Sequence, residues 1–528
     1  MKKTVFFVAL LSLGTLCSAR PAWESATGRP GWASSQAVWS PIGSFGGSGE
    51  DGIGASKTDA DGNLYVAGFF SATASFQKQV LVSYGDADMY LAKFDPRGHL
   101  RWIVQAGGVG LDEGTDLAFD ARGNIYVAGW FSDSTTFQSA NGQSKTVNGY
   151  VHENPFVAKY SPAGQLLWLR SGGSLDFDTG NNRAWGLAVN PRAGTIYMIG
   201  YAEGTTNFST SVGPDQPVTG PFAWHMFLVK YDTQGNFQWG VTNDAEPNSI
   251  GYKVAVDRED SAYVVGWFEG DTTFSSKDGK DQTVAALSGP VQTYPGYPDD
   301  AFLAKYDHEG NLQWVNHAGG YKAIADNLAL SDDGKISITG LVGNINTGSS
   351  SQSETIFTSQ AGGTNINLGG GQYTDPYNWD AFIATYNSSG VLKDAIRIGA
   401  AGQDFGAGII YDRHGNLYLT GVFSGLVDFG GTTLNGTGAN NVFVAKYEDV
   451  GHRGIQLAWA EVILGAGTLG AYQETGPRVW VDAQGPRRNL IVSGIYEGTA
   501  SFGDFQMTSA GADDIYVMNL KVKDEGGW

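Results

Sequence analysis

A short apolar strand that ends in glycine recurs seven times along this 528-residue chain and constrains its fold more than any other feature. The copies are Leu64–Gly68, Ile125–Gly129, Ile196–Gly200, Ala262–Gly266, Ile336–Gly340, Leu417–Gly421 and Leu490–Gly494. A spacing of roughly 60 to 80 residues between the glycines is typical of a repeat architecture, in which each unit buries its apolar surface against its neighbours. We therefore expect one large array rather than a string of unrelated domains.

The second copy illustrates how one unit is built. Leu117–Asp120 is a short apolar strand, and the turn Asp120–Asn124 carries glycine where a positive φ is needed. Ile125–Phe131 and Asn154–Tyr160 follow as the second and third strands, and Gln165–Arg170 is the fourth. Four short antiparallel strands, repeated radially, are typical of a β-propeller blade.

The two ends of the array complement one another. Val38–Gly47 matches the fourth strand of the first unit, Arg101–Gly108, although no other strands precede it. The seventh unit stops after its third strand, which lies within Asp514–Val522. Pairing these end strands would hide two sheet edges that otherwise invite aggregation. The predicted fold is all-β: a single seven-bladed β-propeller of four-stranded antiparallel blades over residues 37–522, closed by an N-terminal strand that completes the last blade.

Asp120–Gly129 with Phe156–Tyr160, and Asp412–Gly421 with Phe443–Tyr447, share one pattern. It reads Asp-x-x-Gly-Asn, an apolar strand to glycine, and then Phe-Val-Ala-Lys-Tyr. In this pattern the chain resembles the bacterial β-propeller repeat often called the SBBP repeat, over about residues 37 to 522. The resemblance implies an exported bacterial protein with a propeller array, and it implies no single activity or catalytic motif.

The N-terminus has the pattern of a signal peptide. Two lysines precede the apolar stretch Val5–Leu16, and Ala19 stands at the expected cleavage position. We predict a signal peptide over 1–19, a flexible leader over 20–36 and a C-terminal tail over 523–528, in a protein that is secreted or held at the cell surface. Lipid anchoring at Cys17 is not expected, because the preceding leucine is bulky where a small residue is needed.

Composition limits the partners. The formal net charge of −20 argues against nucleic acid and anionic lipid, because like charges repel. After the first 20 residues no apolar run is long enough to span a bilayer, so we expect no transmembrane segment in the mature chain. Cleavage after Ala19 removes the only cysteine, so the mature chain has neither a disulfide nor a cysteine nucleophile. We expect a monomer.

Motifs that resemble chemical sites are better explained by the repeat. Gly465–Gly470 matches a dinucleotide fingerprint without a βαβ unit, and Asp59–Asn63 resembles a calcium loop without its further carboxylates. We therefore predict no cofactor and no metal. Acidic residues recur in the loops between units, where they either converge at a channel mouth as cation ligands or bond the backbone of their own turns. They are Asp51, Asp112, Asp176, Asp244, Asp326, Asp404 and Glu474.

Differences between copies indicate where function lies. The connection between the second and third strands varies most, as in 132–153, 202–223, 269–299 and 342–379, and it should emerge on the same face as the loops between blades. Binding on a repeat scaffold belongs where loops vary. The insertions of blades two to five end in aromatic or imidazole side chains: Tyr150, His152, Phe222, Trp224, Tyr294, Tyr297, Tyr373, Tyr377 and Trp379.

Exposed aromatics beside Asn, Asp and Gln suit stacking on sugar rings or gripping a protein. The alternative is that the aromatics fold back and pin their own loops. The leading hypothesis is an exported, non-catalytic recognition or scaffold protein that binds an extracellular glycan or protein through the loop-elaborated face of blades two to five. One alternative is an extracellular carbohydrate-active enzyme, a lyase or hydrolase, with carboxylates at the channel mouth as acid and base. The other is a purely structural surface protein.

Overall fold

The computed structural model describes residues 37–174, 180–245, 247–287, 299–320, 322–343, 354–360, 362–368, 378–400, 402–436, 441–451, 454–465, 479–482 and 490–522. The signal peptide, the leader and the tail predicted from the sequence lie outside these residues. The described part is all-β and includes no α-helix. Correspondingly, it holds no helix long and apolar enough to cross a membrane.

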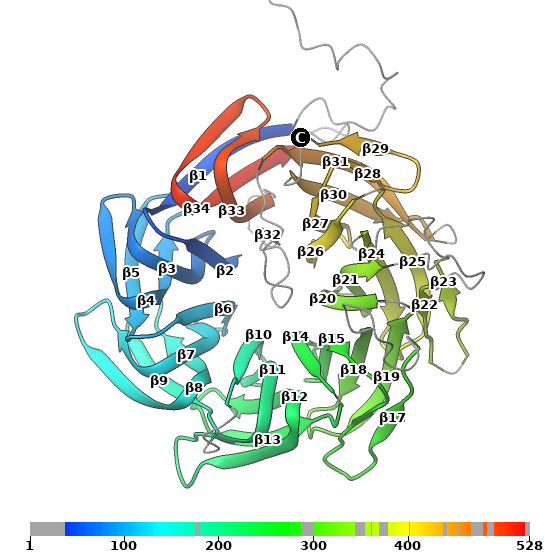
Figure 1. Ribbon diagram of the computed structural model, residues 1–528, viewed down its shortest axis with the longest axis horizontal. Coiled ribbons are helices and arrows are strands. Elements are labelled where there is room, and N and C mark those ends of the chain that lie inside the picture. The colour runs from blue at the N-terminus through cyan, green and yellow to red at the C-terminus, as the bar shows by residue number, and fades with distance from the viewer. Residues whose placement is uncertain are drawn as a thin grey trace, which may run out of the picture.

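Antiparallel units of four strands are arranged radially around a central axis, which is the architecture of a β-propeller (Figure 1). The strands nearest the axis are β2 (Asp51–Thr58), β6 (Asp112–Phe119), β10 (Arg183–Asn190), β14 (Ser249–Val256), β20 (Lys322–Leu330), β26 (Asp404–Tyr411) and β32 (Val479–Asp482). The second strands are β3 (Leu64–Phe76), β7 (Ile125–Gln138), β11 (Thr195–Phe208), β15 (Ala262–Phe268), β21 (Lys335–Gly343), β27 (Leu417–Phe423) and β33 (Leu490–Phe502).

The third strands are β4 (Gln79–Phe94), β8 (Ser144–Tyr160), β12 (Gln216–Asp232), β18 (Asp300–Tyr306), β24 (Trp379–Asn387), β30 (Asn441–Asp449) and β34 (Phe505–Val522). The outer strands are β5 (Leu100–Gly107), β9 (Leu166–Ser171), β13 (Phe237–Thr242), β19 (Leu312–Gly319), β25 (Leu392–Ile398) and β31 (Ile455–Ile463). Short hairpins add β16 (Thr272–Phe274), β17 (Gln282–Val284), β22 (Ile356–Phe357), β23 (Ile366–Asn367), β28 (Leu426–Asp428) and β29 (Thr433–Asn435).

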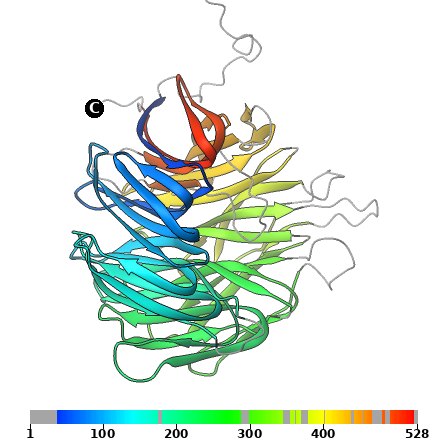
Figure 2. The ribbon, with the colours of Figure 1, turned by 60° about the vertical axis from the view of Figure 1, so that its left-hand side comes forward.

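The N-terminal strand β1 (Ala37–Gly47) lies antiparallel to the C-terminal strand β34. The register runs from Ala37 opposite Val522 to Phe45 opposite Ile515, which is the pairing expected from the sequence. In both views, β1 lies beside the hairpin of β33 and β34 (Figures 1 and 2). Phe45 is buried and stacks on Phe76 and Phe94 of the first unit, so β1 joins the two ends of the chain.

The recurring glycine lies within each second strand rather than at its end, as Gly68 does in β3, and it has a steric cause. A Cβ atom at Gly68 would lie 2.0 Å from the carbonyl oxygen of Gly52, and one at Gly129 would lie 1.9 Å from that of Glu113. In the same region the axial strand carries a β-bulge, between Ile53 and Ala55 in the first unit. A bulge brings the neighbouring backbone close and leaves room only for glycine.

The Asp-x-x-Gly-Asn turns are closed by their own aspartates. Asp120 Oδ1 accepts hydrogen bonds from the backbone N–H groups of Arg122 and Asn124, and Asp120 Oδ2 accepts one from the Asn124 side chain. Asp59 and Asp412 make the same bonds in their turns. These carboxylates therefore hold turns, as the sequence interpretation has it.

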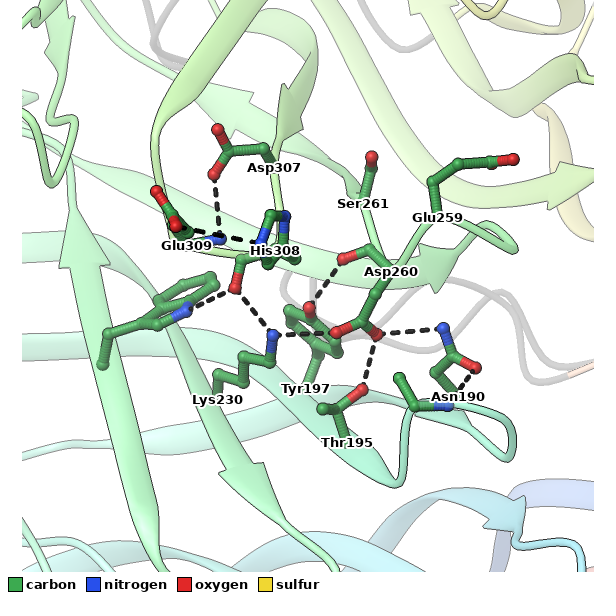
Figure 3. A network of polar contacts seen from close by, with 12 residues as sticks. Asn190, Thr195, Tyr197, Lys230, Glu259, Asp260, Ser261, Asp307, His308 and Glu309 are labelled. Carbon is green, nitrogen blue, oxygen red and sulfur yellow. Dashed lines mark hydrogen bonds and ion pairs between the residues drawn. The ribbon is translucent and has the colours of Figure 1, made fainter.

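Neighbouring units are joined at the end of the propeller that carries the Asp-x-x-Gly-Asn turns, which we call the turn end. There a recurring set of polar contacts, the polar lock, links one unit to the next (Figure 3). In the best-connected case, Lys230 Nζ and Trp239 Nε1 both donate to the carbonyl oxygen of His308 in the next unit, at 2.7 and 3.1 Å. Lys230 also pairs with Asp260 at 2.8 Å, and Asp260 accepts hydrogen bonds from Thr195 and Asn190. The lock combines a charged pair with backbone acceptors, so each unit fixes the orientation of the next.

Candidate functional site

The connections between second and third strands fold back over the outer edge of the propeller. The hairpin of β7 and β8 pairs with the outer strand of the preceding unit, Phe137 opposite Ala106. Its tip bonds the turn of its own unit, with Ala140 N donating to the Gly164 carbonyl at 2.9 Å. A phenylalanine at the same position anchors each hairpin on the third strand, as Phe137 does on Phe156 at 5.0 Å. The hairpin of β7 and β8 therefore covers the outer edge of the preceding unit.

Where these connections return toward the third strands, they place four of the predicted site residues. Tyr150 is half-buried, and its ring lies against Gly173. His152 is exposed and has a φ of 73°. Trp224 and Trp379 are half-buried and pack on one hydrophobic cluster. Tyr294, Tyr297, Tyr373 and Tyr377 lie outside the described residues.

Trp224 is held from three sides. Its indole Nε1 donates to Glu203 Oε1 at 2.7 Å, and its ring lies 5.1 Å from that of Tyr201. Its backbone N–H donates to Asn248 Oδ1 of the next unit at 3.3 Å. Two residues earlier, Phe222 leaves 75% of its surface exposed. Trp224 thus pins its own loop in part, whereas Phe222 is free to meet a ligand.

Arg183 lies at the junction of blades two and three, where it contacts one acidic and two aromatic side chains. Its guanidinium makes two parallel hydrogen bonds to the Glu153 carboxylate, at 2.5 and 2.6 Å. The same group lies 4.5 Å from the ring centre of Trp130 and 5.9 Å from that of Trp185. A bidentate pair between aromatic faces fixes both the cation and the indoles.

A third group of residues lies at the junction of blades four and five. Lys322 pairs with Asp299 at 2.9 Å, and its ammonium lies 5.7 Å from the ring centre of Trp379. Glu269 donates its backbone N–H to the Asn248 carbonyl and accepts a hydrogen bond from the Asn248 side chain at 3.4 Å. Asn248 therefore connects this group to Trp224.

Together these groups lie at the junctions of blades two to five, and we name the set the aromatic arc. It comprises Trp130, Glu153, Arg183, Trp185, Glu203, Trp224, Asn248, Glu269, Asp299, Lys322 and Trp379. Sequence reasoning identified Trp224 and Trp379 but missed the others. One partial signal was available: Glu203, Glu269 and Glu497 stand three residues after the recurring glycine, where Ser71, Ser132 and Ser424 stand in other copies.

Burial changes the acid–base properties of the arc. It raises the pKa of Glu269 to about 7, with further elevation from the charge of Asp299. Burial also raises the pKa of Asp299, although the neighbouring Lys322 acts in the opposite direction. The pKa of Glu203 is raised by burial too, against the hydrogen bond from Trp224. Carboxyl groups of this kind can hold or release a proton near neutrality.

Five of the seven acidic residues predicted at the channel mouth lie in the described part of the chain, and four of these accept hydrogen bonds from backbone N–H groups. Asp51, Asp112 and Asp404 each accept a backbone hydrogen bond from the loop that precedes them, from Gly47, Gly108 and Ala400. Asp244 Oδ1 accepts a hydrogen bond from the backbone N–H of Thr273, in the hairpin strand β16 of the next unit, at 2.5 Å. Asp326 lies within β20, and Asp176 and Glu474 lie outside the described residues. In the described part of the chain, no three His, Cys, Asp or Glu side chains come together as a metal site.

A polar hollow opens at the opposite, turn end of the molecule. Turns around Asp333, Asp412 and Asp449 line it, together with Lys335. Lys335 pairs with Asp333 at 3.2 Å and with Asp449 at 2.8 Å. No described Trp, Tyr or Phe side chain lines this hollow, so the arc is the better candidate for a site that needs aromatic faces.

Comparison with known proteins gives distant relatives. No family model matches the chain. An uncharacterised WD repeat-containing protein of Acanthamoeba polyphaga mimivirus is 23% identical over 241 residues, 41% of this chain and 16% of that protein. The regulatory protein FlaEY of Caulobacter vibrioides is 28% identical over 185 residues, 35% of this chain and 18% of that protein. The matched part therefore spans less than a fifth of either relative, and the likeness to a WD repeat protein agrees with a β-propeller fold.

Two solved structures are also similar, each at 10% identity. The Dos1 propeller matches over 54% of this chain and 65% of that chain, with a TM-score of 0.27. The extracellular domain of a protein described as a one-component system of B. thetaiotaomicron matches over 88% of this chain and 71% of that chain, with a TM-score of 0.20.

Proposed function

We propose that the chain is an exported recognition protein, a closed seven-bladed propeller that binds an extracellular glycan through the aromatic arc. The pairing of β1 with β34 supports closure, and the strand sets around the axis support a count of seven. The N-terminal pattern of two lysines, an apolar stretch and a small residue supports export.

One observation carries the binding proposal: the half-buried indoles of Trp185, Trp224 and Trp379 lie among fixed carboxylate, amide and guanidinium groups of the arc. A sugar ring presents an apolar face and a rim of hydroxyl groups, so it needs aromatic faces with polar groups beside them. Sites for small ligands have this composition, mostly apolar walls with a few oriented polar groups. Because the polar groups of the arc are already bonded to one another, they are preorganised rather than free to collapse.

The raised pKa of Glu269, beside Asp299, favours one second candidate: a lyase or hydrolase that uses these groups as acid and base. Product analysis of any bound glycan distinguishes the two candidates. Intact ligand after prolonged incubation supports the binder, whereas cleavage that Glu269→Gln abolishes, with binding retained, supports the enzyme.

The binding proposal is tested with a glycan array, followed by calorimetric titration of each hit. We expect Phe222→Ala to weaken binding by about tenfold, since an exposed aromatic at a binding surface contributes about 1.4 kcal/mol. Trp224→Phe should weaken it further, because the indole N–H that orients Glu203 is lost.

Val212→Ala is the matched control, since Val212 lies in the turn that leads from β11 into β12, the strand of Phe222 and Trp224, and leaves 82% of its surface exposed. Its affinity and melting temperature should equal those of the unaltered protein. Unchanged affinity in both Phe222→Ala and Trp224→Phe would place the ligand elsewhere. No binding to any glycan would favour a purely structural role.

A further inference from the structure

Three junctions between units each bury two aspartates. One comes from the first residue of an axial strand, Asp51, Asp112 or Asp404, and the other from a third strand, Asp514, Asp88 or Asp380. None of the six leaves more than 4% of its surface exposed. All six aspartates have the same place in the register. Each lies opposite the second-strand residue that follows the recurring glycine by two positions, as Asp51 and Asp88 both lie opposite Phe70.

At two of the three junctions, the two carboxyl groups of a pair lie on either side of a glycine. A Cβ atom at Gly46 would lie 2.3 Å from Asp514 Oδ1 and 2.8 Å from Asp51 Oδ2. A Cβ atom at Gly399 would lie 2.3 Å from Asp380 Oδ1 and 2.7 Å from Asp404 Oδ2. Glycine alone lets the carboxyl groups approach from both sides.

Each pair contains carboxyl oxygens that are buried without a hydrogen-bond partner. They are Oδ1 of Asp51, Asp514, Asp88, Asp380 and Asp404. The opposite oxygens accept backbone N–H groups, as Asp404 Oδ2 does from Ala400 and Asp514 Oδ2 does from Ala510. An unpaired carboxylate oxygen in a buried site is expensive, and two facing ones repel.

The surroundings supply little compensating charge. Among the described residues, Asp380 alone has a cation beside it, with Arg397 Nη1 at 3.4 Å. Around the first pair the other charged groups, Glu50, Glu497 and Asp513, are also acidic. Beside Asp88 and Asp112 the polar neighbours are neutral, Gln105 and Thr135.

The chain also contains a neutral version of the same junction. Asn154 and Asn182 stand where the other junctions have aspartates, and Thr206 bonds Asn182 Oδ1 at 3.0 Å as Thr135 bonds Asp112 Oδ1 at 2.7 Å. Asn182 and Asp112 therefore occupy equivalent positions. An amide can donate where a carboxylate cannot, so this junction needs no extra proton.

We propose that each aspartate pair is held as a carboxylic acid and a carboxylate that share one proton, so that three protons lock the blade junctions and their release loosens the propeller. The proton supplies a donor for the unpartnered Oδ1 of the third-strand aspartate and removes one of the two negative charges of the pair. The inference does not depend on the binding proposal.

Burial supports this assignment, because it raises the pKa of Asp51 and of Asp112 to about 7 and that of Asp404 to about 8. In each pair the charge of the partner raises the pKa further. The proton therefore resides mainly on the axial-strand aspartate.

The sign of the pH dependence follows. The folded pKa values lie above that of an unfolded aspartate, about 3.9, so the folded state binds more protons. The stabilisation is fully present below about pH 4 and is lost as the pH rises through about 7 to 8. His225 and His317, whose pKa values burial lowers to about 4, have the opposite dependence and act below about pH 6.5.

The test compares the full chain with the triple variant Asp51→Asn, Asp112→Asn and Asp404→Asn between pH 6.5 and 8.5. Each asparagine keeps an oxygen that accepts the backbone N–H and adds an amide that can donate to the partner carboxylate. We expect the unfolding equilibrium constant of the unaltered protein to increase by up to about tenfold per pH unit for each proton released. In the triple variant most of this dependence should disappear, with stability at pH 6.5 retained.

Infrared spectra of the folded protein at pH 6.5 give a second measurement that does not depend on unfolding. The carbonyl band of protonated carboxyl groups should lose the intensity of three groups in the triple variant. Glu269→Gln is the control for another group with a raised pKa, and it should leave the pH dependence of the junctions in place.

Three results would overturn the proposal. An unchanged pH slope together with an unchanged infrared band means that no shared proton exists. Equal destabilisation of the triple variant at every pH means that the junctions need both carboxylates. A melting temperature that calcium raises in the unaltered protein but not in the variant means that the pairs hold a cation.

Discussion

Asp116 shows how a single residue can connect several blades. It lies fully buried on β6, and its two oxygens pair with Lys57 of β2 at 3.1 Å and Lys253 of β14 at 2.7 Å. The backbone N–H of Leu187, on β10, donates to it as well at 2.8 Å. Four successive axial strands thus meet at one carboxylate, and Lys253 is itself buried.

Asp116→Ala should lower the free energy of unfolding by about 3–5 kcal/mol, because it leaves two lysines near the axis without their counter-charge. Chemical denaturation monitored by tryptophan fluorescence measures the change. The pKa of Asp116 is lowered by the two lysines despite its burial, so this stabilisation is present above the unfolded pKa of about 3.9 and is lost as the pH falls.

Asp332→Ala is the matched control for this residue. Asp332 forms an ion pair with Arg258 at 2.8 Å, but both side chains are exposed, so its loss should change stability by less than about 0.5 kcal/mol. If Asp116→Ala were equally mild, water would reach the lysines and the axis would not be a dry core.

At the scale of elements, blades are joined by a lysine and a tryptophan that reach the same carbonyl in the next unit. Lys93 and Trp102 donate to Pro162, and Lys159 and Trp168 donate to Thr233. Lys230 and Trp239 continue the series at His308. Each lysine also lies about 5 Å from a tyrosine ring of its own blade, as Lys230 does from Tyr197 at 5.1 Å.

Trp239→Ala should destabilise the protein by about 3–5 kcal/mol, because a buried indole that packs on Tyr197 is replaced by a cavity. Trp239→Phe keeps most of the packing and loses the hydrogen bond to His308, so about 1 kcal/mol is expected. Urea unfolding of both variants separates the contribution of packing from that of the hydrogen bond. Gln238→Ala, at an exposed neighbouring position on β13, is the control. Equal losses in the two tryptophan variants would contradict the packing argument.

The repeated elements could be predicted from sequence because their causes are local. Gly68 and its equivalents are required by a close backbone approach, and Asp120 closes its turn with bonds to residues two and four positions later. The folding-back of the hairpins could not be predicted, since strand periodicity does not say which edge a hairpin covers. The aromatic arc was missed for a related reason: Arg183, Glu153 and Trp130 come together only across a blade junction.

At the scale of the whole molecule, the first strand, β1, and the last strand, β34, join the two ends of the array. β1 supplies the outer strand beside β34 and also contacts β3, with Gly46 opposite Ser75. The sequence could predict this pairing because an unaccompanied fourth strand at one end matched a missing one at the other. What sequence could not show is that Phe45 enters the core of the first unit.

Deletion of residues 37–45 should therefore destabilise the whole protein rather than fray one end. It exposes the edge of β34 and uncovers Phe76, Phe94 and Phe502, which Phe45 and Trp39 contact. The loss of Phe45 alone corresponds to about 3–5 kcal/mol. We expect a markedly lower melting temperature and concentration-dependent aggregation through the free edge.

A second experiment adds a synthetic peptide of residues 37–47 back to the truncated protein. Because an extended peptide can add to an exposed edge strand, it should raise the melting temperature toward that of the full chain, in proportion to its concentration. The same peptide with Phe45→Ala should rescue poorly, and a scrambled peptide not at all. A truncated protein that melts like the full chain would show that the ring holds without β1, and the two ends of the array would then be joined by contacts other than this strand.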